Sequence, residues 1–183
     1  MNISVFGGSQ IKPGEEAYQN AEKLGNLLAR SGYTVLTGGY IGVMEAVSRG
    51  AGTAGGQVVG VTCDEIETWR PVGPNAWITE ERRYPTLRQR LFALIDGCDA
   101  AITMPGGIGT LAEMAEMWSQ IQCRAITPRP IVLVGTGWQD TISVFYSSFE
   151  GYIPHQYRRL LTFAKDVETA VAYLNNHLKD RGA

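Results

Sequence analysis

The chain has 183 residues, of which 44% are hydrophobic and 19% charged, and its formal net charge is −2. These values are ordinary for a globular protein and predict a single domain spanning residues 1–183. They exclude nucleic acid as a partner, which would require a basic patch, and no apolar run approaches the roughly 20 residues that cross a membrane.

The first part of the chain alternates short apolar runs with amphipathic segments. In chain order it predicts a strand at 3–6, a helix that ends at the "RSGY" turn, a strand at 34–37, a helix at 42–51 and a strand at 57–61. Residues 62–85 are rich in proline and tryptophan, and they predict an irregular segment with a short strand at 76–78.

The same alternation continues through the second part of the chain. It predicts a helix at 86–98, a strand at 99–104, a helix at 110–122, a strand at 130–135, a helix at 140–152, a strand at 160–164 and a helix at 166–178. Alternating strands and helices are typical of α/β proteins. The sequence therefore predicts an open, mostly parallel sheet of about seven strands with helices on both faces.

Cysteine and histidine residues give no sign of a metal or a disulfide framework. The three cysteines are widely spaced and form no CxxC pair, and neither His155 nor His177 stands in a metal-binding spacing. The N-terminus lacks the basic and apolar regions of a signal peptide. We therefore expect a cytoplasmic protein that holds no metal and no cofactor.

Three glycine-rich turns follow predicted strands. They read "GGSQ" at 7–10, "GGYIG" at 38–42 and "PGGIGT" at 105–110, and they include Ser9, Gly38 and Gly39. The carboxyl ends of parallel strands meet at one edge of a sheet, and glycine lets the backbone approach a phosphate at a helix N-terminus. The turns predict a cleft for a nucleotide-like anion, although the P-loop and GxGxxG motifs are absent.

The residues after the third turn admit two readings. In "TLAE", Thr110 and Glu113 match a T-x-x-E capping box, in which the two side chains bond backbone N–H groups at the start of a helix. Alternatively, a carboxylate one turn into a phosphate-binding helix would face the sugar of a bound nucleotide. The two roles are compatible, so the sequence leaves both open.

Two arginines lie on the helix that precedes this region. Arg88 and Arg90 are two positions apart, so they cannot share a helix face. We expect one of them to be solvated and the other to point into the cleft, where an arginine fork matches phosphate geometry.

Three motifs together resemble a known enzyme family. "VFGGSQ", "TGGYIGVMEAVSRGA" and "DAAITMPGGIGTLAE", in this order and spacing, resemble the Lonely Guy (LOG) family over roughly residues 3 to 135. "PGGIGTLAE" fits the P-G-G-x-G-T-x-x-E motif of that family in full. The resemblance implies a Rossmann-like, homodimeric nucleoside 5′-monophosphate phosphoribohydrolase, which cleaves the N-glycosidic bond of AMP or cytokinin-type nucleotides to base and ribose 5-phosphate.

The resemblance also implies roles for particular residues. The catalytic glutamate of the family falls on Glu113, and the catalytic arginine of its M-H-x-R-K segment aligns with Arg90 in "LRQRL". Arg88 and Leu91 replace the histidine and the lysine of that segment, and Arg88 is expected to supply the missing positive charge as a substrate- or phosphate-binding residue. A hydroxyl residue near the phosphate falls on Ser119, and a substrate-contacting glutamate on Glu65. The phosphate-binding turn falls on Gly106, Gly107, Ile108, Gly109 and Thr110.

Two further alternatives stay open. The second turn departs from the usual glycine-rich form at Tyr40 and Glu45, which favours a carrier or sensor of the same fold that binds a nucleotide or molybdenum cofactor without chemistry. The helix at 110–122 carries four large apolar residues at helical spacing, which suit either the core or a dimer interface. They are Met114, Met117, Trp118 and Ile121.

Overall fold

A parallel sheet organises the structure, a computed structural model that describes residues 1–178. Within that part of the chain, seven strands follow the order β4-β3-β2-β1-β5-β6-β7, and all neighbours are parallel. The strands are β1 Asn2–Phe6, β2 Thr34–Thr37, β3 Val58–Cys63, β4 Glu80–Tyr84, β5 Ala100–Thr103, β6 Ile131–Val134 and β7 Leu161–Ala164. The predicted sheet is confirmed and is wholly parallel; residues 179–183 of the predicted domain lie outside the described residues.

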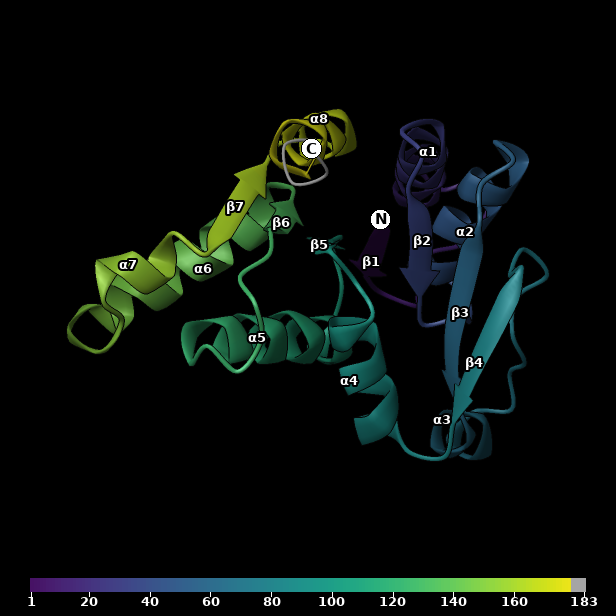
Figure 1. Cartoon of the computed structure of the whole chain (residues 1–183), viewed down its shortest axis with the longest axis horizontal. Helices are drawn as coiled ribbons and strands as arrows, with labels where there is room; N and C mark the ends of the chain where they lie inside the picture. The colour runs from purple at the N-terminus through teal and green to yellow at the C-terminus, as the bar shows by residue number, and fades with distance from the viewer. Residues whose placement is uncertain (179–183) are drawn as a thin grey trace.

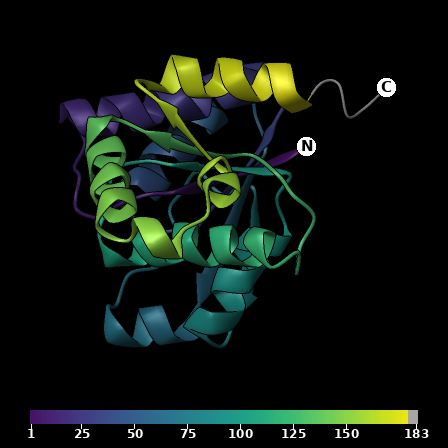
Figure 2. The same cartoon turned by 90° about the vertical axis from the view of Figure 1, so that its left-hand side faces the viewer.

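Helices cover both faces of this sheet, as predicted (Figures 1 and 2). One face carries α1 Glu16–Arg30, α2 Val43–Thr53 and α8 Val167–Leu178. The other carries α4 Leu87–Asp96, α5 Ile108–Gln122 and α6 Thr136–Ser148. Three short elements complete the described chain: α3 Asp64–Trp69, the 3-10 helix Glu150–Tyr152 and α7 His155–Arg158.

Side chains of each strand alternate between the two helix layers. In β1, Ile3 and Val5 pack into the cluster beneath α1, α2 and α8, whereas Phe6 packs into the cluster of α4, α5 and α6. Strands that are buried on both faces read as continuous apolar runs rather than as alternating patterns. This burial explains why the central strands were readily predicted.

The segment 62–85 corrects the sequence prediction. The prediction of a strand at 76–78 is wrong. Residues 76 and 77 form a turn, Ile78 has no regular structure, and the strand β4 begins at Glu80 instead. Its sequence "EERRY" is mostly charged, since β4 is an edge strand that pairs with β3 alone. A six-residue helix, α3, also lies within the segment predicted to be irregular.

The start of α5 corrects a second expectation. The helix begins at Ile108 with Gly107 as its N-cap, and no side chain of the described residues caps it. Thr110 therefore lies inside the first turn, and Glu113 forms an ion pair with Arg90. The capping-box reading of "TLAE" is wrong because the glycines allow the helix to start two residues before Thr110. Likewise, α6 runs from Thr136 to Ser148 rather than from 140 to 152.

The apolar residues of α5 belong to the core of the chain itself. Met114 and Met117 are fully buried, and Trp118 and Ile121 are at least nine-tenths buried, in the cluster beneath α4, α5 and α6. The core reading of this stripe is confirmed. Among residues 1–178, no helix combines the length and the apolar character needed to span a membrane.

The strand order reverses at β1. Strands β2, β3 and β4 lie on one side of it, and β5, β6 and β7 lie on the other. Open α/β sheets bind ligands beyond the carboxyl ends of their strands at such a reversal. Two of the glycine turns touch at this point, because the Gly8 backbone N–H donates to the Pro105 carbonyl at 3.1 Å.

Candidate active site

A cavity of about 450 Å³ opens beside this reversal, at the carboxyl ends of β1 and β2 and the start of α5. Its volume lies within the range of small-molecule sites. Eight residues predicted from the sequence line it: Ser9, Gly38, Arg90, Gly107, Ile108, Gly109, Thr110 and Glu113. Segments far apart in the sequence thus converge on one cavity.

Two predicted glycines are not part of the lining but are adjacent to lining residues in the chain. Gly39 has a φ of +82°, a conformation that side chains rarely adopt, so this turn depends on glycine. A Cβ atom on Gly106 would overlap the Thr110 hydroxyl. Both glycines therefore shape the cavity without contributing to its wall.

Three other predicted residues lie away from the cavity wall. Arg88 is exposed, and its guanidinium lies 5.8 Å from the Phe92 ring centre. The Glu65 carboxylate accepts a 2.7 Å hydrogen bond from the Leu87 backbone N–H at the start of α4. Ser119 is exposed on α5, two turns beyond the cavity. The structure does not bring these three together with the eight lining residues.

The first turn of α5 presents backbone donors to the cavity. Gly107 is the N-cap, no described side chain caps the helix, and Ile108 is 82% exposed. The first N–H groups of a helix lack internal partners, and the macrodipole adds partial positive charge there. Residues 107–110 therefore form a surface suited to an anion such as a phosphate.

Arg90 is buried and fixed in the cavity by several contacts. Its Nε donates to the Val61 carbonyl at 2.8 Å, and its Nη1 forms a 3.5 Å ion pair with Oε1 of Glu113. Its guanidinium lies 5.8 Å from the Tyr40 ring centre. A Cβ atom on Gly38 would overlap the guanidinium, so this position of Arg90 requires the glycine. Of the two arginines on α4, Arg90 is the one that points into the cavity.

Glu113 is the carboxylate of this pair. Its side chain is 15% exposed, and burial raises its pKa from 4.5 to about 7, while the Arg90 charge opposes the rise. A carboxyl with a pKa near neutrality can take up or release a proton at physiological pH. Perturbed carboxyls in cavities are frequent at catalytic sites.

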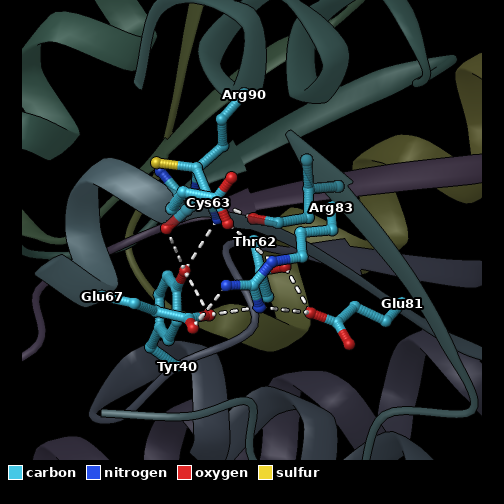
Figure 3. Close-up of polar contacts among 9 residues, drawn as sticks. Tyr40, Thr62, Cys63, Glu67, Glu81, Arg83 and Arg90 are labelled. Atoms are coloured by element: carbon cyan, nitrogen blue, oxygen red, sulfur yellow. Dashed lines mark hydrogen bonds and ion pairs between the residues drawn. The ribbon is translucent and has the colours of Figure 1, made fainter. Parts of the chain in front are cut away.

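Tyr40 lines the cavity, a role that the sequence did not reveal. Figure 3 shows its polar contacts with Cys63 and Glu67. Its buried hydroxyl accepts a 2.8 Å hydrogen bond from the Cys63 backbone N–H. Two acceptors compete for its proton: the Cys63 carbonyl at 3.1 Å and the Glu67 carboxylate at 3.3 Å. Glu67 in turn binds Arg83 at 2.7 and 3.0 Å. Tyr40 thus ties the second glycine turn to the end of β3 and to α3.

Trp69 and Arg70 also line the cavity, and the sequence analysis missed them. They lie at the end of α3, inside the segment predicted to be irregular, and belong to no motif. Trp69 is 77% exposed and gives the cavity mouth an apolar wall. The one available signal was a tryptophan–arginine pair shortly after the carboxyl end of a strand.

In residues 1–178, no group of three or more histidine, cysteine, aspartate or glutamate side chains is placed to hold a metal ion. The fold and the cavity define a Rossmann-like α/β protein with a cavity of small-molecule size at its topological reversal.

Comparison with known proteins identifies the family. The model of a family described as "Possible lysine decarboxylase" matches residues 44–174, and the chain belongs to that family. A curated relative from Rhodococcoides fascians, named cytokinin riboside 5′-monophosphate phosphoribohydrolase, is 29% identical over 181 residues, which are 96% of this chain and 89% of the relative. The resemblance to the LOG family is confirmed.

Solved structures share the fold. The X-ray structure of TM1055, a structural-genomics target, is 31% identical with a TM-score of 0.74, and the match covers 96% of this chain and 98% of that one. A molybdenum cofactor binding protein from Rippkaea orientalis is 23% identical with a TM-score of 0.75, and the match covers 97% and 96% of the two chains. The same fold thus occurs in a protein named as a cofactor binder.

Proposed function

We propose that this protein is a nucleoside 5′-monophosphate phosphoribohydrolase, which releases the base of AMP or a cytokinin-type nucleotide and ribose 5-phosphate. The observation that carries the proposal is the buried pair of Arg90 and Glu113 in one cavity with the uncapped start of α5. An anion site and a carboxylate of raised pKa, side by side, match the two ends of a nucleotide: its phosphate and its glycosidic bond.

The chemistry proposed for the site is a hydrolysis at C1′ of the ribose. The bond from C1′ to the base nitrogen breaks, water supplies the oxygen that replaces it, and a water proton passes to the departing base. Positive charge develops on the sugar in the transition state, and the Glu113 carboxylate stabilises it or activates the water. Arg90 polarises the base or binds phosphate, since a guanidinium hardly ever releases its proton.

The remote phosphate contributes by positioning the sugar. Binding energy from a non-reacting group can hold the reacting bond in place for attack. The glycine turn of residues 107–110 is the proposed site of that phosphate. We expect truncated substrates without a phosphate to react more slowly as well as to bind more weakly.

Incubation with AMP and separation of adenine by chromatography test the proposal directly. Wild-type protein should release adenine, while Glu113→Gln should bind AMP but lose turnover. Glu116→Gln is the matched control, because Glu116 lies on the same helix, outside the cavity lining, and bonds Gln120. Full activity in Glu113→Gln would remove this residue from the mechanism.

A carrier or sensor is the second candidate. The molybdenum cofactor binding protein that shares the fold supports it, together with the departures of the second turn at Tyr40 and Glu45. A carrier would bind a nucleotide or cofactor in the same cavity without releasing a base. Protection of the protein from heat by AMP, with no adenine formed, would favour this candidate.

A further inference from the structure

The charges in the cavity are unevenly matched. Two arginines, Arg70 and Arg90, and one glutamate, Glu113, line it. Arg90 is paired with Glu113, whereas Arg70 forms no ion pair with any carboxylate in the described residues, 1–178. One positive charge of the cavity is therefore uncompensated when Glu113 is ionised.

The guanidinium of Arg70 also has unused hydrogen-bonding capacity. Its Nη1 donates to the Ser9 hydroxyl at 3.3 Å, and its Nε is buried without a partner among the described residues. The guanidinium carbon lies 5.5 Å from the ring centre of Trp69. A guanidinium carries five N–H donors, and a buried donor without an acceptor is costly. A ligand with several oxygen acceptors would satisfy these donors.

The position of Arg70 brings it to the anion-binding turn. Its partner, Ser9, directly follows Gly8, whose backbone N–H bonds Pro105 at the start of the third glycine turn. A Cβ atom on Gly8 would lie 3.2 Å from the Cα of Gly106. The first and third glycine turns are thus in contact, and Arg70 is attached to them through Ser9.

We propose that Arg70 binds the phosphate of the substrate, together with the Ser9 hydroxyl and the backbone N–H groups at the start of α5. The inference rests on the proposed function, in which the cavity takes a nucleoside monophosphate. A phosphate monoester supplies three oxygen acceptors and a charge near −2, and arginine forks match its geometry. Arg90 then serves the reacting end of the nucleotide, because Glu113 already occupies one side of its guanidinium.

The test compares AMP with adenosine, which lacks the phosphate. Arg70→Met should raise the dissociation constant and the KM for AMP about 10- to 100-fold, the usual effect of losing a charge-assisted contact. It should leave adenosine binding close to wild type, because adenosine carries no phosphate. It should also lower the kcat for AMP, because the bound phosphate positions the sugar for attack. Arg70→Lys should recover part of the loss, since it keeps the charge but not the fork.

Arg30→Met is the matched control, because Arg30 is exposed at the end of α1 and is not one of the residues that line the cavity. An unchanged affinity of Arg70→Met for AMP would overturn the inference, and so would an equal loss for AMP and adenosine. Calorimetric binding separates this result from the fate of the hydrolase. If wild-type protein binds AMP without releasing adenine, the hydrolase proposal fails while the affinities still decide the role of Arg70.

Discussion

The ionisation of the Glu113 carboxyl should make the free energy of unfolding depend on pH, and Glu113→Gln should remove that dependence. Burial raises the pKa of this group from 4.5 to about 7 in the folded state. The folded protein therefore holds an extra proton between these two pH values. Stability from this group is fully present below the unfolded pKa and is lost as the pH rises through about 7.

The size of the effect follows from the two pKa values. They differ by about 2.5, and each unit of pKa corresponds to about 1.4 kcal/mol, so the full cost of ionising Glu113 in the fold is about 3 kcal/mol. Glu113→Gln keeps the shape of the side chain and cannot ionise. The free energy of unfolding of the variant should therefore gain about 2–3 kcal/mol on wild type between pH 5 and pH 8.

Urea unfolding at several pH values, followed by the fluorescence of the buried Trp118 and Trp138, measures this difference. All other titrating groups are shared by the two proteins, so their contributions largely cancel in the comparison. Two curves that stay parallel from pH 5 to pH 8 would refute the reasoning, since they would mean that the Arg90 charge fully offsets burial. Under the hydrolase proposal, the rate of base release should also rise through about pH 7.

Three other predictions concern the cavity and the assembly. Gly38→Ala should displace the Arg90 guanidinium from the Val61 carbonyl and from Glu113. Turnover should fall by about tenfold or more and thermal stability should fall as well, because these buried groups lose their partners; a wild-type rate would contradict this. Tyr40→Phe should lower the free energy of unfolding by about 1–3 kcal/mol, because it leaves the Cys63 N–H without its hydrogen-bond acceptor. An unchanged midpoint of chemical denaturation would argue against this hydrogen bond. We also propose a homodimer, so light scattering should give about 40 kDa, twice the 20.0 kDa of the chain; a mass of one chain would exclude it.

The fold was largely predictable because buried strands and half-buried helices have recognisable patterns of apolar residues. Strands such as β1 and β6 are covered on both faces, so they read as apolar runs between amphipathic helices. The edge strand β4 escaped detection because its residues Glu80–Tyr84 pair on one side only and four of the five are charged. The start of α5 was misplaced because a T-x-x-E pattern is a local signal, whereas the glycines before it decide where the helix begins.

Only those site residues that belong to a recognisable sequence motif could be predicted. The glycine turn, Glu113 and the pair of arginines on α4 were visible in the sequence, and spacing indicated that only one arginine would enter the cavity. Spacing did not distinguish Arg90 from Arg88; that distinction depends on packing against Val61 and Gly38, which are far away in the sequence. Residue type and spacing contain no information on such contacts.

Arg70 is a second case in which the sequence did not reveal a residue of the cavity. Its segment has no periodicity and no motif, so nothing in the sequence separated it from the other basic residues of the surface. Arg70 differs from the other arginines in its ion-pair partners. Arg83, nearby in the chain, is paired with Asp64 and Glu67. Arg70 lines the cavity and has no carboxylate partner in the described residues. An arginine without a carboxylate partner favours an anionic ligand, because the ligand supplies the hydrogen-bond acceptors that the folded protein lacks at this position. The unpaired arginine is therefore stronger evidence for a ligand than the paired one, although Arg90 lies in the motif and Arg70 does not.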